Sequence, residues 1–242
     1  AIRKARYNYH FKRIRNMNLF RGVFRTFEEA ERFLPEGFSK GYDNEQSAKM
    51  YKQFCETINP SDYPNLLWLS KILKEGTTVF DLGGHIGVKF YSYQKFINFP
   101  ESYNWTVYDV PAVVEEGREW AKEYNSKNLT FSHNLMGFDG FEVLLLSGSL
   151  QYMNLDIADK LKEVNQKPEH IIISTALTHL DTFYSINNIG TSYCVYVLRN
   201  EKRFIRDIEE AGYELIDKWR NEGKKCTIPF YPEHSIDGYR GL

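Results

Sequence analysis

The sequence predicts an α/β fold, a doubly wound and mostly parallel seven-stranded sheet with an N-terminal helical cap. Up to Gly76 the chain reads as helical, and after it short β-rich runs alternate with amphipathic helices. Such alternation is typical of a parallel sheet wound by right-handed crossovers. The length of 242 residues suits one principal core with an appendage. We therefore expect a helical arm and cap over residues 1–75 and a cofactor-binding domain over residues 76–242.

Each predicted element has a local signal. Strands are expected where β-branched and aromatic runs are bounded by turn residues, at residues 78–82, 105–109, 129–132, 142–146 and 170–174. Helices are expected where apolar residues recur every three or four positions, at residues 27–34, 45–58, 64–73, 87–96, 112–124, 155–164 and 201–211. A strand over 213–219 and another near the C-terminus complete the seven.

Composition and charge exclude several classes of protein. With 42% hydrophobic and 26% charged residues the chain is globular, and a net charge of −1 argues against a general nucleic-acid binder, which needs a basic excess. The three cysteines are widely spaced, which indicates neither a disulfide framework nor a metal site. No apolar run approaches the roughly 18 residues of a transmembrane helix. We expect a cytoplasmic protein.

The N-terminal arm is basic and aromatic. Eight Lys or Arg residues and no acid occur between Arg3 and Arg25. This pattern fits an amphipathic surface helix, an arm that attracts an anionic substrate or a membrane surface, or a homodimer contact. We expect the arm and cap to act as a lid over the substrate. The candidate substrate-binding residues are Arg13, Arg15, Tyr42 and Asp43.

The strongest motif is residues 79–87, Val-Phe-Asp-Leu-Gly-Gly-His-Ile-Gly. An apolar strand ends in an acid, glycines allow a tight turn close to a ligand, and a helix follows. Any nucleotide-like ligand fits this turn. However, Asp81 would repel a diphosphate, whereas it would pair with the ammonium group of S-adenosylmethionine. The motif therefore favours S-adenosylmethionine over a dinucleotide.

Further cofactor contacts are expected where the other strands end. Asp109 ends the second strand, where a carboxylate can accept hydrogen bonds from both ribose hydroxyls. Polar residues also follow the third and fourth strands, near the expected adenine and sulfonium. The full set of candidate cofactor residues is Asp81, Gly83, Gly84, His85, Gly87, Asp109, Val110, His133, Asn134, Ser147 and Gln151.

Residues 81–87 resemble the Asp/Glu-x-Gly-x-Gly-x-Gly motif of class I, Rossmann-like methyltransferases, with His85 in place of the middle glycine. More closely, the chain resembles a small bacterial methyltransferase family associated with surface-polysaccharide genes. That likeness rests on Gly22-Val23-Phe24, Gly41-Tyr42-Asp43 and the run from Leu145 to Tyr152, and spans about Gly22 to Tyr213. It implies methylation of an anionic or sugar-linked small molecule, a precursor of a capsule or surface polysaccharide. Relatives tend to have Asp-Arg-Thr where this chain has Ser174-Thr175-Ala176.

Methyl transfer depends mainly on holding the nucleophile and the methyl group aligned, so a catalytic base is optional. Our catalytic candidates are His179, oriented by Asp181, and Tyr152. His85 is a weaker candidate base, because a residue inside the glycine turn more readily shapes the pocket. Two rival hypotheses stay open, a nucleotide-dependent oxidoreductase and a catalytically silent protein of the same fold that acts as a partner.

Overall fold

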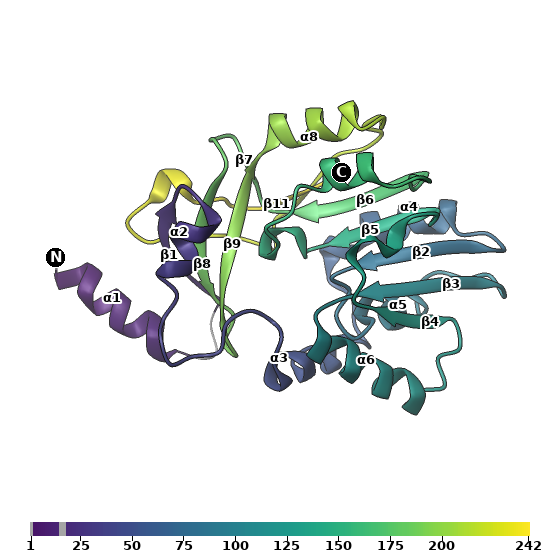
Figure 1. Ribbon diagram of the computed structural model, residues 1–242, viewed down its shortest axis with the longest axis horizontal. Helices are drawn as coiled ribbons and strands as arrows, with labels where there is room; N and C mark the ends of the chain where they lie inside the picture. The colour runs from purple at the N-terminus through teal and green to yellow at the C-terminus, as the bar shows by residue number, and fades with distance from the viewer. Residues whose placement is uncertain (1, 15–17) are drawn as a thin grey trace.

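The computed structural model describes residues 2–14 and 18–242, which form two sheets (Figure 1). The larger sheet has seven strands in the order β10-β11-β6-β5-β2-β3-β4. The strands are β2 (Thr77–Leu82), β3 (Tyr103–Tyr108), β4 (Leu129–Ser132), β5 (Val143–Ser147), β6 (His170–Thr175), β10 (Trp219–Asn221) and β11 (Tyr239–Gly241). β2 to β6 are parallel, and β11 is antiparallel to both of its neighbours. The predicted doubly wound, mostly parallel sheet is confirmed.

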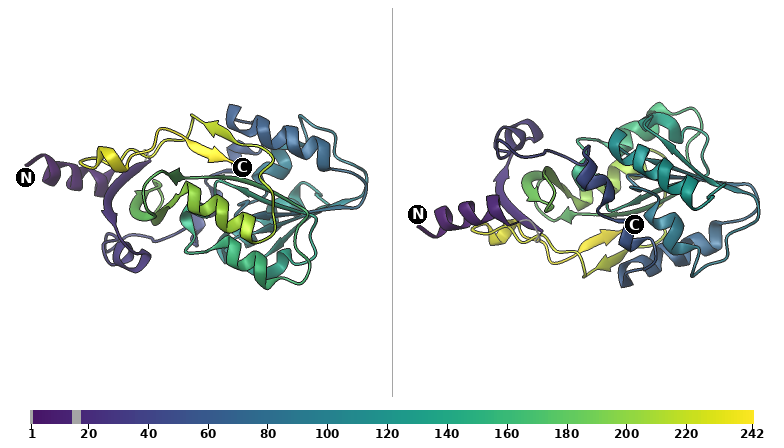
Figure 2. Two further views of the ribbon diagram at one scale, coloured as in Figure 1. Left: turned by 90° about the horizontal axis from the view of Figure 1, so that it is seen from above. Right: turned by 90° about the horizontal axis from the view of Figure 1, so that it is seen from below.

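Helices cover both faces of this sheet (Figure 2). α4 (Tyr63–Ile72) and α5 (Val88–Tyr93) pack against the face that presents Val79 and Leu145. α7 (Ile157–Glu163) and α8 (Glu201–Glu210) pack against the face that presents Phe80 and Leu144. Alternate residues of a strand point to opposite faces, so β2 and β5 are apolar on both sides. α6 (Pro111–Glu123) begins with a proline, whose fixed φ suits the first turn of a helix.

A second, four-stranded sheet has the order β1-β8-β9-β7 and was not predicted. It combines β1 (Leu19–Phe24) from the N-terminal region with an insertion after β6, made of β7 (Leu177–Thr178), β8 (Phe183–Asn188) and β9 (Tyr193–Asn200). β1 pairs antiparallel with β8, where Leu19 lies opposite Asn188. The reading of the whole N-terminal region as helical was therefore wrong at β1. The partner strand lies too far along the chain for a local pattern to reveal it.

Two of the N-terminal helices, α2 (Phe27–Arg32) and α3 (Glu45–Lys49), are shorter than expected, whereas α4 was predicted within one residue at each end. α1 (Ile2–Arg13) leads into the second sheet, and α2 is capped by Thr26, whose side chain accepts a hydrogen bond from Glu29 N. The single helix predicted over 45–58 is instead α3 (Glu45–Lys49) followed by the 3₁₀ turn η1 (Lys52–Phe54). The strand predicted over 213–219 was also wrong, because regular structure begins only at β10.

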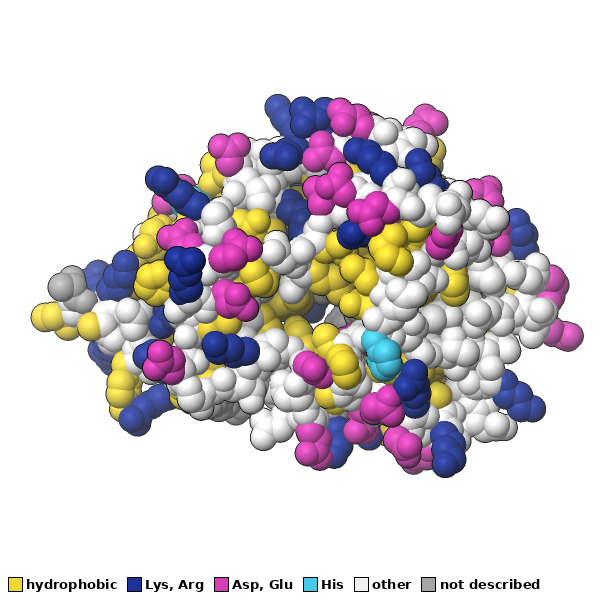
Figure 3. Space-filling model, in the orientation of Figure 1, with side chains coloured by type: hydrophobic (Ala, Val, Ile, Leu, Met, Phe, Trp, Pro, Cys, Tyr) yellow, Lys and Arg dark blue, Asp and Glu magenta, His cyan; other side chains and the backbone are white. Residues whose placement is uncertain are grey.

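The carboxyl ends of the parallel strands face the second sheet, as the arrowheads in Figure 1 show. On this side the molecular surface is hollowed between the two sheets, and hydrophobic side chains gather in the hollow (Figure 3). We call this hollow the crevice. Across residues 2–14 and 18–242, no helix has the length and apolar character needed to cross a membrane.

Candidate cofactor site

The glycine turn follows β2 at the edge of the crevice. Gly83, His85 and Gly87 have φ values of 75°, 59° and 87°, in the left-handed region that side chains other than glycine rarely adopt. A Cβ on Gly84 would overlap the Asp81 carboxylate, and a Cβ on Gly83 would collide with Ser149. The turn therefore needs glycine for both conformation and space, as the sequence motif predicts.

Asp81 is buried beneath this turn, with only 1% of its surface exposed. Its Oδ2 accepts a hydrogen bond from Trp105 Nε1 at 3.2 Å, which is a weak, neutral partner for a carboxylate. Burial raises the pKa of Asp81 to about 7, and the nearby charge of Lys89 offsets this only in part. A buried carboxylate of this kind is suited to binding a cation.

Asp109 lies directly after β3 and contacts the same turn. Its Oδ2 accepts from the backbone N–H of His85 at 2.9 Å, and its Oδ1 accepts from that of Val110 at 2.8 Å. Burial raises the pKa of Asp109 to about 6, and the charge of Asp43 adds to the rise. Asp43 itself accepts from Ala112 N at the start of α6. The structure thus brings Asp43, Asp81 and Asp109 together at the carboxyl ends of β2 and β3.

His85 is a neutral side chain that packs inside the turn. Its Nε2 lies 2.9 Å from Ser47 O, so Nε2 carries the proton and Nδ1 is left as an acceptor. Nδ1 is buried and has no partner in the part of the chain that the structure describes. Burial lowers the pKa of His85 to about 4. With its ring against Tyr51, His85 links the turn to the N-terminal region.

The chain after β5 is fixed tightly against the turn. Ser149 Oγ donates to Leu82 O at 2.5 Å, and Gln151 bonds Gly148 O and Thr175 Oγ1 through the two ends of its amide. The guanidinium of Arg199 donates to three backbone carbonyls of this segment, those of Leu150, Met153 and Leu155. Ser147 Oγ accepts from Asn65 Nδ2 at 3.2 Å.

Tyr152 lies between the two sheets. Its hydroxyl donates to Asn187 Oδ1 on β8 at 3.1 Å, and its ring contacts Tyr42 and Tyr196 edge-on, each with centroids 5.2 Å apart. Burial raises the pKa of Tyr152 well above its ordinary value, so the phenol stays protonated. Tyr42 and Tyr152, predicted from separate segments, therefore meet in the crevice.

Other predicted residues are not brought to this cluster. His179 and Asp181 lie on the exposed turn between β7 and β8, and neither has a side-chain hydrogen bond or ion pair within residues 2–14 and 18–242. Arg13 lies on α1, with its guanidinium 4.3 Å from the Tyr9 ring centroid. His133 and Asn134 follow β4 and are exposed. Arg15 lies outside the described residues.

Three residues of the site were missed, namely Trp105, Ser47 and Asn65. Trp105 lies opposite Val79 on the neighbouring strand, so its side chain shares a face with Asp81. That Trp105 and Asp81 share a face can be recognised only once the register of β2 and β3 is known. Asn65 is a polar residue on the apolar face of α4, beside Leu66 and Leu69, which was a weak indication.

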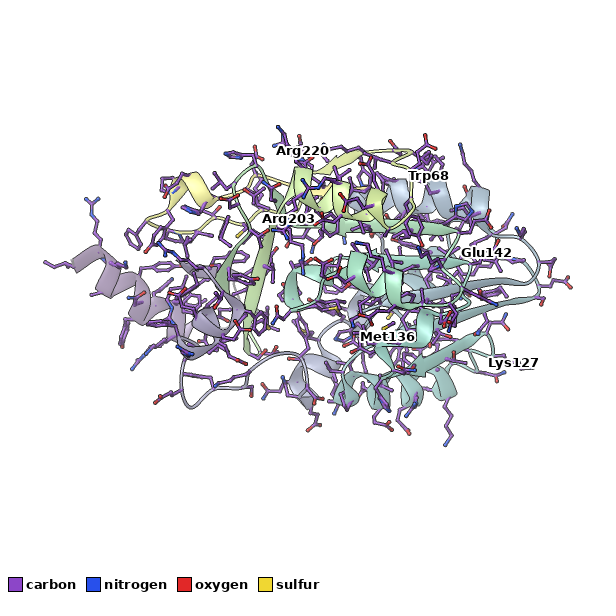
Figure 4. The ribbon with its side chains drawn as sticks, turned by 45° about the horizontal axis from the view of Figure 1, so that its top comes forward. Trp68, Lys127, Met136, Glu142, Arg203 and Arg220 are labelled. Atoms are coloured by element: carbon purple, nitrogen blue, oxygen red, sulfur yellow. The ribbon has the colours of Figure 1, made fainter. Side chains whose placement is uncertain are left out.

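Two cavities lie away from the crevice. One of about 620 Å³ is lined by aromatic side chains of α5 and α6 and by Lys127, which lies at the edge where β4 begins (Figure 4). The other, of about 290 Å³, lies beside β1 and includes Lys4, Arg21 and Phe230. Neither is lined by the glycine turn or by Asp109.

No family model and no curated protein sequence matches the chain. Among solved structures, it aligns with magnesium protoporphyrin IX methyltransferase from Synechocystis PCC 6803, solved with bound S-adenosylhomocysteine, at a TM-score of 0.51 and 11% identity, covering 83% of this chain and 95% of that chain. It also aligns with a candidate sarcosine dimethylglycine methyltransferase from Galdieria sulphuraria, at a TM-score of 0.50 and 9% identity, covering 74% and 78%. A match to the cyclase SpnF, with a TM-score of 0.49 and 14% identity, covers 66% of this chain and 61% of that protein's length.

The architecture and the first two alignments agree. The fold is that of Rossmann-like methyltransferases, with the sheet order and the single antiparallel strand described above.

Proposed function

We propose that the chain is an S-adenosylmethionine-dependent methyltransferase that binds its cofactor at the glycine turn. The observation that carries this proposal is the excess of acceptors there. Asp81 is a buried carboxylate with one weak partner, Asp109 is a second carboxylate at the next strand end, and His85 Nδ1 is a buried acceptor without a donor. S-adenosylmethionine brings an ammonium group and two ribose hydroxyls, which are donors.

The same acceptors oppose the oxidoreductase alternative. A nicotinamide dinucleotide would place a diphosphate against the turn, where Asp81 lies directly beneath Gly84. An anion there would face the Asp81 and Asp109 carboxylates, and Lys89, whose charge acts on Asp81, is already paired with Asp62. This arrangement favours a ligand that is cationic at the turn.

When bound, the cofactor supplies a methyl group on a sulfonium centre. The residues of this chain then hold the two reactants. Asp81 and Asp109 fix the cofactor, while the loop after β5, held by Arg199, orients Tyr152 in the crevice. Because Tyr152 stays protonated, we assign it an orienting role toward the acceptor rather than that of a base. His179 and Asp181 remain proposals that would require the exposed turn to move.

The acceptor we propose is a small molecule methylated on oxygen, a sugar or phosphoryl-type precursor of a bacterial surface polysaccharide. This choice of acceptor rests on the resemblance of the sequence to a bacterial methyltransferase family associated with surface-polysaccharide genes. Tyr42 and Asp43 lie beside the crevice and support a cap that closes over the acceptor. Arg13 on α1 has a cation–π partner in its own helix, so a phosphoryl acceptor receives less support than a sugar hydroxyl.

The direct test is isothermal titration calorimetry of the purified chain with S-adenosylhomocysteine, NAD and NADP. We expect S-adenosylhomocysteine to bind and the two dinucleotides to give no measurable heat. Binding of NAD or NADP in preference would favour the oxidoreductase, and binding of no ligand would favour the silent partner protein. Methyl transfer to a panel of nucleotide sugars, followed by mass spectrometry, then identifies the acceptor.

Asp109→Asn is expected to weaken S-adenosylhomocysteine and adenosine by a similar factor, about tenfold, because both ligands carry the ribose that Asp109 would contact. Calorimetry with each ligand measures this. Asp159→Asn, which changes an exposed carboxylate on α7, is the matched control and should leave both affinities unchanged. Wild-type adenosine affinity in Asp109→Asn would remove Asp109 from the site.

A further inference from the structure

Asn65, near the start of α4, belongs to a buried polar network beside the glycine turn. The side chain is 1% exposed. Its Nδ2 donates to Tyr93 Oη at 3.0 Å and to Ser147 Oγ at 3.2 Å. Its Oδ1 is fully buried and, among the described residues, has no hydrogen-bond partner. A buried acceptor without a donor is costly, which suggests that a ligand completes it.

The neighbours fix which end of the Asn65 amide is free. Tyr93 Oη donates to Asp62 Oδ1 at 3.1 Å, and a carboxylate is the strongest acceptor within its reach. Since the phenol has a single proton, its oxygen can only accept from Asn65. The atom next to Tyr93 must therefore be Nδ2, and Oδ1 is the free end. Lys89, bonded to the same Asp62 oxygen, holds this network in place.

The free oxygen lies on the same side of the sheet as Asp81. Asp81 pairs with Leu145 in the parallel register, and Ser147 is two residues further along β5, so all three side chains point to one face. Ser147 contacts Asn65 directly. The charge of Asp81 also acts on the network, because it adds to the rise in the pKa of Tyr93. Two buried acceptors, the Asp81 carboxylate and Asn65 Oδ1, thus belong to residues that lie on the same face of the sheet.

We propose that Asn65 Oδ1 and the Asp81 carboxylate together form a subsite for a primary ammonium group, in which Asn65 selects ligands that carry the amino group. The inference rests on the proposed function, since that ammonium belongs to the methionyl part of the cofactor. An ammonium has three N–H donors, so it can bond a carboxylate and an amide oxygen at once. α4, an element of the N-terminal region, then takes part in cofactor recognition.

The test compares two ligands by calorimetry on the full chain. S-adenosylhomocysteine has the amino group, whereas 5′-methylthioadenosine has the same adenosine and a thioether without it. Asn65→Leu should weaken S-adenosylhomocysteine about tenfold and leave 5′-methylthioadenosine unchanged. Asn65→Asp, which keeps an acceptor in place and adds a negative charge, should keep or increase the preference for S-adenosylhomocysteine over 5′-methylthioadenosine, and it provides a second variant if the leucine variant does not fold.

Leu69→Ala is the structural control, because it opens a cavity under the same helix without touching the acceptor. It should change both affinities equally. The inference is overturned if Asn65→Leu weakens both ligands to the same degree, if it leaves S-adenosylhomocysteine unchanged, or if Asn65→Asp reduces the preference for S-adenosylhomocysteine over 5′-methylthioadenosine. If the wild-type chain binds neither ligand, the proposed function itself is wrong, which is a distinct result.

Discussion

The Asp81→Asn variant is expected to bind S-adenosylhomocysteine about 10- to 100-fold more weakly than the wild type at pH 8, while its ligand-free form unfolds at a higher temperature. The substitution keeps the shape of the side chain and an acceptor for Trp105 Nε1. It removes the charge that would pair with the ligand ammonium, a loss of about 1.5–3 kcal/mol. It also removes the cost of burying a carboxylate without a cation.

This cost gives the ligand-free protein a defined pH dependence. Burial raises the pKa of Asp81 from 3.8 to about 7, so the folded chain holds this proton more tightly than the unfolded chain does. The stabilisation that the tightly held proton of Asp81 gives the folded chain is complete below about pH 4, and it is lost as the pH rises through about 7. We expect the melting temperature of the wild type to fall between pH 5 and pH 8, and to fall less in Asp81→Asn.

The measurements are differential scanning calorimetry across this pH range and titration with S-adenosylhomocysteine at pH 8. Glu119→Gln, which neutralises an exposed carboxylate on α6, is the control and should behave as the wild type in both. A variant that keeps wild-type affinity would show that Asp81 does not meet the ligand ammonium. An unchanged pH dependence of melting would show that Asp81 is not the buried group that titrates.

Gly84→Ala is expected to abolish measurable binding of S-adenosylhomocysteine and to lower the free energy of unfolding by about 1–3 kcal/mol, the range for overpacking. The added Cβ would occupy the space of the Asp81 carboxylate, so either the turn or the carboxylate must move. Both belong to the proposed cofactor site. A displaced carboxylate could not meet the ammonium, which is why binding should suffer more than folding.

Urea denaturation and calorimetry measure the two effects. Gly223→Ala is the matched control, because the nearest atom to its added Cβ is Asn221 Oδ1 at 3.4 Å, an ordinary contact. That variant should keep both stability and affinity. If Gly84→Ala bound the ligand normally, the close packing of the turn on Asp81 would have no role in recognition.

The sequence predicted the core of the fold because its signals there are local. β4 was predicted at its observed bounds, and β2, β3, β5 and β6 within two residues at each end. Buried parallel strands are short apolar runs, and the helices between them show their own periodicity, so each element can be recognised from its own residues. For the same reason the glycine turn and Asp81 were found together, since they lie within seven consecutive residues.

The remaining features depend on pairings between distant segments, which local patterns do not encode. β1 is stabilised by β8, more than 150 residues away, so its six residues carry little strand signal of their own. Asn65 acquires its free acceptor only because Tyr93 and Ser147 converge on it from α5 and β5. The sequence by itself determined the sheet and the acid beneath the turn, through local periodicity and turn chemistry. Only the tertiary structure decided what surrounds that acid, because burial and hydrogen-bond partners are properties of packed segments rather than of single ones.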